Sequence, residues 1–228
     1  MLLSPQATPL SPQQWANLPP RPEVVTAARR RGVTRVVHFT TVLGVVGIIS
    51  SRAVKSRKRL PTEKHLERVY RPNALERRGD VAWHDYVNLS VSRINVWMFD
   101  HSERWHVDER VSWVLLSFAP DILGDPGVVF STTNNIYPAC LRAEGLPGFA
   151  KMFEDPVFGR YRERHTRNGL ADCLTTDRQA EVLYPGQLAL DRLERIYVQV
   201  ETAVDDLHGA LGAFDLDYPV DLAPQEFQ

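Results

Sequence analysis

The stretch Asp177-Arg178-Gln179-Ala180-Glu181-Val182-Leu183 carries the strongest signal in this 228-residue chain. A polar approach leads into an apolar run that is typical of a buried strand, and a single carboxylate, Glu181, stands at the junction. One acid at such a place, rather than a pair, suits chemistry in which a fixed negative charge faces a developing positive charge. The stretch therefore predicts a buried strand that begins with a functional acid.

Short β-rich segments recur on both sides of this stretch. We expect strands over residues 33–39, 87–91, 113–118, 127–131, 180–184 and 196–200. We expect helices over 60–71, 204–211 and 40–50, where Leu43, Val46 and Ile49 have helical spacing and Thr40 or Thr41 can cap the start. Few of the strands are separated by a helix of βαβ length. The pattern therefore favours an α+β fold with a split, mainly antiparallel sheet flanked by helices.

The order of the segments also predicts how the chain is divided. Residues 1–22 are rich in Pro, Gln and Ser and predict an N-terminal arm, flexible or packed on the surface, before a single domain over 23–228. The interval 136–177 is polar and Arg-rich, and we expect it to form a long loop that faces a substrate. The chain has no internal repeat, P-loop or GxGxxG fingerprint, which excludes the Rossmann mode of dinucleotide binding.

Composition indicates an ordinary globular protein in a reducing compartment. Hydrophobic residues make up 43% of the chain and charged residues 24%, which excludes general disorder. The two cysteines, Cys140 and Cys173, are too few and too far apart for a disulfide framework or a zinc cluster. The longest apolar run, residues 42–49, is far short of a membrane span, so we expect a cytoplasmic protein without a membrane partner.

The net charge of −1 hides a separation of charge along the chain. Seven acids and no Lys or Arg follow residue 200, which leaves 27 basic against 21 acidic residues before it. Positive charge gathers in two clusters, one at 52–59 with Arg57 and Lys58, the other at 160–167 with Arg162 and Arg164. Such clusters neutralise phosphates and indicate nucleic-acid binding, with a merely solvated surface as the alternative.

Other kinds of site have weaker support. The possible metal ligands are His84, His101, His106, Asp85, Asp108 and Glu109. Their spacings match no standard zinc pattern, so we predict no metal. Ser90 and Ser92 lack the G-x-S-x-G elbow of a serine hydrolase, and Cys173 alone is more typical of packing than of a nucleophile.

Three ordered motifs together resemble the DarT family of the ADP-ribosyltransferase superfamily, toxins that use NAD to modify bases in DNA. Val37-His38-Phe39-Thr40 is similar to the family's opening strand with its His-x-Thr signature. His84-Asp85-Tyr86-Val87, followed by Ser92-Arg93 and Met98, is similar to the family's His-Asp-Tyr-Val strand. The stretch from Arg178 to Leu183 is similar to the strand with the catalytic glutamate, and it is the most specific of the three.

The resemblance implies a role for each matching residue. Glu181 would orient a ribose hydroxyl of NAD and stabilise an oxocarbenium-like sugar while a base nitrogen captures C1′. Arg68 and Arg71 both qualify as the family's catalytic arginine. The residues expected to bind the co-substrate NAD are His38, Phe39, Thr40, Tyr86 and Arg93, although Tyr86 as core packing and Arg93 as a brace of the sheet are alternatives. The residues expected to contact the nucleic acid are Asn88, Arg57, Lys58, Arg162, Arg164 and Arg178.

One departure from the family bears on the base. The thymidine-modifying branch has Pro-Phe-Tyr-Phe after Tyr-Val, whereas this chain has Asn88-Leu89-Ser90-Val91. Because Asn88 can offer a donor and an acceptor to a base edge, we expect guanine in preference to thymine, in single-stranded DNA, where the base needs no extrusion.

The resemblance further implies the toxin of a toxin–antitoxin or phage-defence pair, with an antitoxin of the ADP-ribosyl-glycohydrolase type. Two alternatives stay open at this point. One is a transferase directed at RNA or protein, and the other is a non-enzymatic nucleic-acid-binding module.

Overall fold

The computed structural model describes residues 8–60, 81–107 and 111–228, and the statements below concern these residues. The long strands are β1 (Val36–Thr41), β3 (Tyr86–Val91), β4 (Trp113–Phe118), β9 (Glu181–Pro185) and β11 (Leu193–Val198). The short strands are β2 (Ala53–Lys55), β5 (Val129–Ser131), β6 (Arg142–Glu144), β7 (Val157–Phe158), β8 (Arg164–His165), β10 (Gln187–Ala189) and β12 (Val220–Leu222).

The helices lie at both ends of the chain and between the strands. The α-helices are α1 (Pro12–Ala16), α2 (Pro22–Arg30), α3 (Val42–Ser51), α5 (Val96–Trp105), α6 (Gly145–Lys151) and α7 (Thr202–Gly212). Short 3-10 helices are η1 (Arg57–Arg59), η3 (Pro120–Gly124), η4 (Arg160–Arg162), η5 (Leu190–Arg192) and η6 (Pro224–Phe227).

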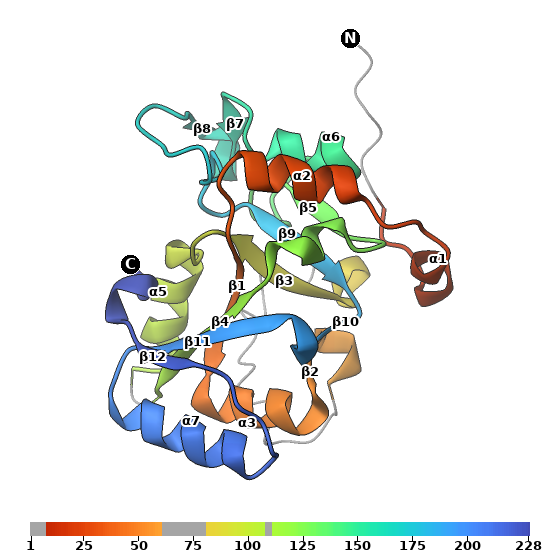
Figure 1. The fold of residues 1–228 in the computed structure, drawn as a ribbon. Helices are drawn as coiled ribbons and strands as arrows, with labels where there is room; N and C mark the ends of the chain where they lie inside the picture. Colours follow the sequence, from red (N-terminus) through yellow and green to blue (C-terminus); the bar gives the residue numbers. More distant parts are fainter. Residues whose placement is uncertain (1–7, 61–80, 108–110) are drawn as a thin grey trace.

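One large sheet organises the fold. Its strand order is β12-β11-β4-β1-β3-β9-β5-β6 (Figure 1). Each neighbouring pair is antiparallel except β11 with β12, which are parallel. Two small antiparallel pairs, β2 with β10 and β7 with β8, stand apart from it. The predicted α+β fold with a mainly antiparallel sheet flanked by helices is confirmed.

The first motif folds as a strand that runs straight into a helix. The side chain of Thr41 accepts a hydrogen bond from the backbone N–H of Gly44 at 3.1 Å, which caps α3 at one of the two predicted positions. Val45 and Ile49 are buried, so the side of the helix that carries them faces the core. Because β1 leads directly into this capped helix, the side chains at its end are fixed in place.

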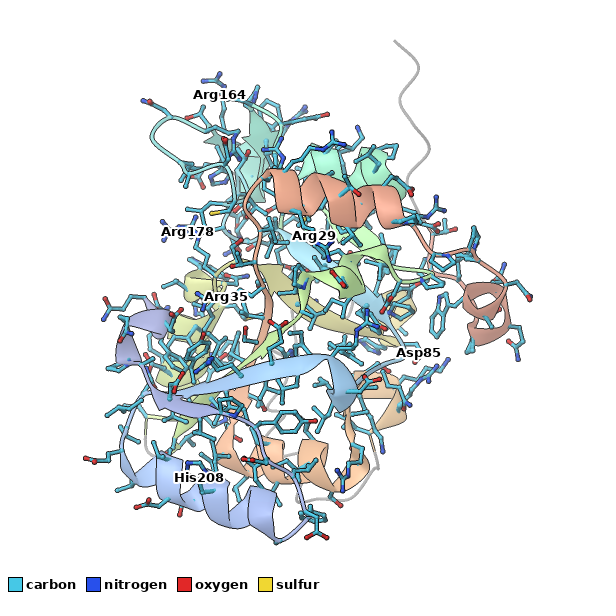
Figure 2. All side chains as sticks on the ribbon, viewed as in Figure 1. Arg29, Arg35, Asp85, Arg164, Arg178 and His208 are labelled. Carbon is cyan, nitrogen blue, oxygen red and sulfur yellow. The ribbon has the colours of Figure 1, made fainter. Side chains whose placement is uncertain are left out.

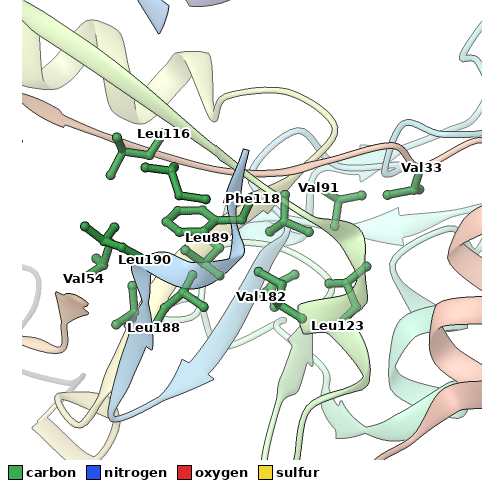
Figure 3. Packing of buried hydrophobic residues seen from close by; sticks show 14 of the residues in the cluster. Val33, Val54, Leu89, Val91, Leu116, Phe118, Leu123, Val182, Leu188 and Leu190 are labelled. Atoms are coloured by element: carbon green, nitrogen blue, oxygen red, sulfur yellow. The ribbon is translucent and has the colours of Figure 1, made fainter. Parts of the chain in front are cut away.

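Helices α2, α3, α6 and α7 contribute to the main hydrophobic cluster. Figure 1 shows α2 with α6 at one end of the sheet and α3 with α7 at the other. Figure 3 shows the centre of this cluster, where Leu89, Phe118 and Val182 from three strands pack together. Because side chains alternate along a strand, the neighbours of each of these residues on its own strand point to the opposite face of the sheet.

The opposite face of the sheet carries two smaller hydrophobic clusters. One gathers around α5 and includes Phe99, Trp113 and Leu115. The other includes Tyr86 and Leu183 together with Trp15 from α1. Residues of both clusters, among them Trp113 and Tyr86, also line a cavity.

Residues of the N-terminal arm pack on the sheet through aromatic contacts. Trp15 is buried, and its ring lies edge-on to that of Tyr86 at a centroid distance of 5.3 Å. The Tyr86 hydroxyl accepts hydrogen bonds from Trp15 Nε1 at 3.0 Å and from the Leu10 backbone at 3.1 Å. These contacts attach α1 to strand β3.

The interval 136–177 is not the single long loop that we expected. It contains β6, α6, β7, η4 and β8, and Phe149, Met152 and Phe153 are buried in the main cluster. Gly148 weakens the helical signal of α6, but a Cβ there would lie 2.0 Å from the carbonyl oxygen of Ala143. Glycine is therefore used for close packing of α6 on β6 rather than to break a helix.

None of the described helices is long and apolar enough to cross a membrane. Both cysteines are free thiols, with Cys140 buried and Cys173 partly exposed. The expected helix over 60–71, with Arg68 and Arg71, lies almost wholly outside the described residues.

Candidate active site

The large sheet is split between β1 and β3. These strands pair at two positions only, Val36 with Val91 and Val37 with Ser90. At the next residue the side chain of His38 lies between the strands, and its Nδ1 is 3.0 Å from the carbonyl oxygen of Asn88. Replacing backbone pairing by a side chain opens a cavity of about 180 Å³ at this point.

The walls of the cavity come from six parts of the chain. They are residues 37–41 of β1, residues 55–57, residues 86–90 of β3, the α5 segment with Asn95, Met98, Ser102, Trp105 and His106, and the two residues Trp113 and Glu181. Glu181 is the one acid among these wall residues. The first, second and third motifs of the sequence therefore meet in a single cavity.

Glu181 is held rigidly at the start of β9. Its side chain is buried, with the residue 5% exposed, and Oε2 accepts a hydrogen bond from the backbone N–H of Asn135 at 2.8 Å. Asn135 is itself fixed by Arg142, whose guanidinium donates to both the side chain and the carbonyl oxygen of Asn135. A buried carboxylate held in this way can face a developing positive charge without first reorganising.

His38 is held as a neutral ring with a defined tautomer. A carbonyl oxygen only accepts, so Nδ1 carries the hydrogen toward Asn88 and Nε2 is left as an acceptor. Burial lowers the pKa of His38, and the hydrogen bond to Asn88 offsets part of this shift. The cavity thus contains a neutral hydrogen-bonding histidine and one buried acid, Glu181.

His106 is a site residue that the sequence analysis considered only as a metal ligand. Its Nδ1 lies 2.9 Å from the carbonyl oxygen of Ser102, and its ring stands edge-on to Trp113 at 5.6 Å. Nε2 is buried and has no hydrogen-bond partner among the described residues. The signal that could have found it is helical spacing, since Met98, Ser102 and Trp105 follow one face of α5 up to this histidine.

The remaining residues predicted to bind NAD have different surroundings. Thr40 and Phe39 line the cavity, and Phe39 also packs edge-on against Phe99 and Trp113. Tyr86 lines it as well, and its hydroxyl accepts hydrogen bonds from Trp15 and Leu10 of the N-terminal arm. Arg93 lines a second, more open cavity of about 520 Å³ instead.

The predicted nucleic-acid contacts separate into two groups. Asn88 and Arg57 line the cavity with Glu181, whereas Lys58 is turned toward Asp85, with 3.8 Å between the charged groups. Asp85 also accepts from Arg59 at 2.7 Å and from Ser56 at 2.9 Å. Part of the basic cluster at 52–59 therefore braces the wall of the cavity.

The other predicted contacts lie outside the cavity walls. Arg162 and Arg164 belong to η4 and β8, and Figure 2 shows Arg164 on the outlying β7–β8 pair. Arg178 is exposed three residues before Glu181. Arg68 and Arg71 fall outside the described residues. Within the described ranges, no group of three His, Cys, Asp or Glu side chains could hold a metal ion.

This arrangement narrows the class of enzyme. Glycosidases that stabilise a similar cationic sugar use two carboxylates placed roughly 5 to 9 Å apart. Among the described residues, this cavity has a single acid. One buried glutamate in a cavity of a mainly antiparallel sheet, with a neutral histidine in the same cavity, is the arrangement that the resemblance to ADP-ribosyltransferases implies.

Comparison with known families identifies the particular kind. The family model described as "ssDNA thymidine ADP-ribosyltransferase, DarT" matches residues 37–228, so the chain belongs to the DarT family. It is an NAD-dependent DNA ADP-ribosyltransferase, with NAD as co-substrate. No curated protein matches the sequence.

Solved structures support the fold. The chain is similar to Thermus sp. 2.9 DarT in complex with ADP-ribosylated ssDNA, with 15% identity, a TM-score of 0.60, and coverage of 86% of this chain and 97% of that one. It is similar to the same DarT in complex with NAD+, with 16% identity, a TM-score of 0.56, and coverage of 83% and 96%. Thermosipho africanus DarTG in complex with ADP-ribose gives 11% identity, a TM-score of 0.54, and coverage of 85% and 51%.

Proposed function

We propose that this enzyme transfers ADP-ribose from NAD to a guanine base in single-stranded DNA and acts as the toxin of a toxin–antitoxin or phage-defence pair. The observation that carries the chemistry is Glu181, which is the one acid among the described residues of the cavity walls and is buried and held by the Asn135 backbone. The similar Thermus DarT structures with NAD+ and with ADP-ribosylated ssDNA support the two substrates.

In the proposed reaction Glu181 acts on the ribose next to nicotinamide. As the bond from C1′ to the pyridinium nitrogen breaks, its electron pair goes to nicotinamide, which leaves as a neutral molecule. The carboxylate of Glu181 stabilises the positive charge left on the sugar, more strongly in the transition state than in the ground state. A nitrogen of the base then donates its lone pair to C1′ and gives up a proton.

We propose that the neighbouring residues position the two substrates. His38 and Thr40 hold the ribose side of NAD, and Phe39 and Tyr86 form the wall behind it. The tautomer of His38 supports this role, since its Nε2 can accept from a ribose hydroxyl. Arg68 or Arg71 supplies the catalytic arginine, and Arg57, Lys58, Arg162 and Arg164 attract the strand.

The choice of guanine rests on Asn88. Its side chain lies in the cavity and makes no hydrogen bond with other described residues, so both its donor and its acceptor are available to a base. On its Watson–Crick edge guanine offers such an amide an acceptor, O6, beside a donor, N1–H. The family description names thymidine, and the absence of the aromatic-rich segment in this chain is the reason to favour the other base.

Mass spectrometry of oligonucleotides tests the reaction and the base together. Single-stranded oligonucleotides that lack guanine or lack thymine are incubated with NAD and the enzyme, with RNA and protein pools in parallel. We expect a mass gain of one ADP-ribose unit on the oligonucleotides that contain guanine. Modification of thymine alone would refute the choice of base, and label on RNA or protein alone would favour those alternatives.

The biological setting is proposed on chemical grounds. An ADP-ribosylated base cannot pair with a templated nucleotide, so the product blocks replication and requires an activity that removes it. We propose a cognate antitoxin of the ADP-ribosyl-glycohydrolase type, acting with this enzyme in the cytoplasm. Co-expression tests this, because growth arrest by the enzyme should be relieved by the glycohydrolase and absent with Glu181→Gln.

A further inference from the structure

Strand β3 ends in a strained turn that places Arg93. Ser92 has φ of 63°, in the left-handed region that few residues other than glycine adopt. The backbone N–H of Arg93 donates to the carbonyl oxygen of Val91 at 2.7 Å, which closes a three-residue turn of the rare, strained kind. The chain thus leaves the sheet abruptly at this arginine.

The surrounding structure holds this turn with three hydrogen bonds. The N–H of Ser92 donates to the carbonyl oxygen of Arg35 at 3.1 Å, and Arg35 Nε donates to the carbonyl oxygen of Ser92 at 2.8 Å. The hydroxyl of Ser92 donates to the carbonyl oxygen of Cys173 at 2.8 Å. Backbone strain that neighbouring contacts enforce in this way is common where a side chain is positioned for a ligand.

The guanidinium of Arg93 lacks an acidic partner among the described residues. Its Nε is buried without a hydrogen-bond partner there. The pKa of Arg93 is lowered by burial and, next in size, by the positive charge of Arg178. Arg178 is exposed and makes no salt bridge with the described residues. Two neighbouring arginines therefore lie in one region, and neither forms a salt bridge with a carboxylate of the described residues.

The second cavity, of about 520 Å³, gives Arg93 room for a ligand. Two other arginines line this cavity, but Arg35 is paired with Glu226 and Arg195 with Asp221. Glu194 lines it as well, and no salt bridge joins it to Arg93. The positive charge that is available to an anion is thus that of Arg93, with Arg178 beside it.

The pair of arginines lies close to the reactive glutamate. The β3–β9 ladder ends at Leu89 with Val182, and beyond it Arg93 continues from β3 while Arg178 precedes β9. Arg178 precedes Glu181 by three positions, so their Cα atoms are at most about 11 Å apart. Figure 2 shows Arg178 and Arg35 on the same side of the molecule. An anion between the two arginines would lie next to the substrate of Glu181.

We propose that Arg93 and Arg178 bind a phosphodiester of the single-stranded nucleic acid, adjacent to the base that is presented to Glu181. This site rests on the proposed function. Guanidinium groups hold phosphate oxygens through several fixed donors, and the phosphate relieves the repulsion between the two cations. The pyrophosphate of NAD has the same chemistry, but the arginines line or flank the second cavity rather than the one with His38.

Binding measurements without turnover test the site. In the Glu181→Gln background, the affinity for a fluorescein-labelled single-stranded oligonucleotide is measured by anisotropy at several salt concentrations. We expect Arg93→Gln and Arg178→Gln each to weaken binding about tenfold and to reduce the slope of log K against log salt by about 0.7, the value for one phosphate on a single strand. Arg178 is exposed, so its variant separates binding from folding even if Arg93→Gln lowers stability.

Arg29→Gln is the matched control. It removes the same charge from α2, where Arg29 is 65% exposed and forms a surface ion pair with Asp121 at 2.8 Å. We expect its affinity for the oligonucleotide to stay within twofold of the parent. An equal loss of affinity in the control and in the Arg178 variant would show that binding depends only on overall positive charge, and it would overturn the proposed site.

The affinity for NAD identifies the source of the phosphate. We expect the same variants to bind NAD as the parent does. Weakened binding of NAD with unchanged binding of the oligonucleotide would assign the arginines to the pyrophosphate and overturn the proposal, as would no change in either. If the wild-type enzyme modifies no DNA while oligonucleotide binding still depends on Arg93, the proposed function fails and this site stands.

Discussion

The replacement Glu181→Gln tests the chemistry of the site most directly. The amide has the size of the carboxylate and its oxygen can still accept from the Asn135 N–H, now 2.8 Å from Oε2, so the fold and the cavity should persist. What disappears is the negative charge, in a side chain that is only 5% exposed. We expect transfer of ADP-ribose to fall while binding of NAD changes little.

The size of the loss follows from the surroundings of Glu181. Opposite charges about 4 Å apart interact by about 4 kcal/mol at the effective dielectric constant of about 20 that describes protein sites. Since about 1.4 kcal/mol corresponds to a factor of ten in rate, losing this interaction in the transition state slows transfer by about 10³. Removal of a fixed group that stabilises developing charge has a similar effect in other enzymes.

Single-turnover transfer to an oligonucleotide, followed by mass spectrometry, measures this rate. Glu144→Gln is the matched control, because Glu144 lies in the same sheet on β6 and pairs with Arg21 at 3.4 Å on the surface. The control should keep its rate within about twofold, since such ion pairs contribute little. A Glu181→Gln enzyme that transfers within tenfold of wild type would refute the electrostatic role.

Three further predictions concern the pocket and the arm. His106→Phe keeps a ring against Trp113 but removes Nε2. The dissociation constant for NAD should rise about tenfold, because one buried hydrogen bond is lost. An unchanged constant in calorimetry would show that Nε2 contacts no part of NAD. Burial lowers the pKa of His38, so the unfolded chain binds a proton at a pH where the folded chain does not. The free energy of unfolding should therefore fall as the pH drops below about 6.5, and should fall less steeply in His38→Gln. Urea unfolding at several pH values measures this, and equal slopes for the two proteins would contradict it. Trp15→Ala should lower the free energy of unfolding by about 3 kcal/mol in the same assay, whereas a loss below about 0.5 kcal/mol would show a detachable arm.

Local patterns predicted six of the strands and, among the described α-helices, α3 and α7, whereas they missed α1, α2, α5, α6 and the short strands β2, β6, β7, β8, β10 and β12. The alternation in β3, the apolar run of β4 and the helical spacing of α3 come from neighbours in sequence, so each element appears within a few residues of its expected bounds. The missed helix α6 contains Gly145, Pro147 and Gly148, which weaken its intrinsic tendency. It forms because Phe149 is buried in the main cluster, which a local pattern does not reveal.

The sequence by itself singled out the residues that we propose carry the chemistry. Glu181 stood out as an acid at the start of an apolar strand within a motif that resembles the family's, and His38 as a residue of the strand that leads into a capped helix. The family resemblance added the order of the three motifs, and the family match over residues 37–228 agrees with it.

Only the tertiary structure decided which of these residues meet. His38 contacts the carbonyl of Asn88, 50 positions away, and Glu181 accepts from Asn135, 46 positions away. Tertiary contacts also give neighbours in sequence different surroundings, because Arg57 lines the cavity while Lys58 and Arg59 pair with Asp85. Side-chain periodicity is a property of a few adjacent residues, whereas strand register and the split between β1 and β3 depend on packing over the whole sheet. The position of a charge relative to the cavity therefore follows from the assembled sheet and not from the local sequence.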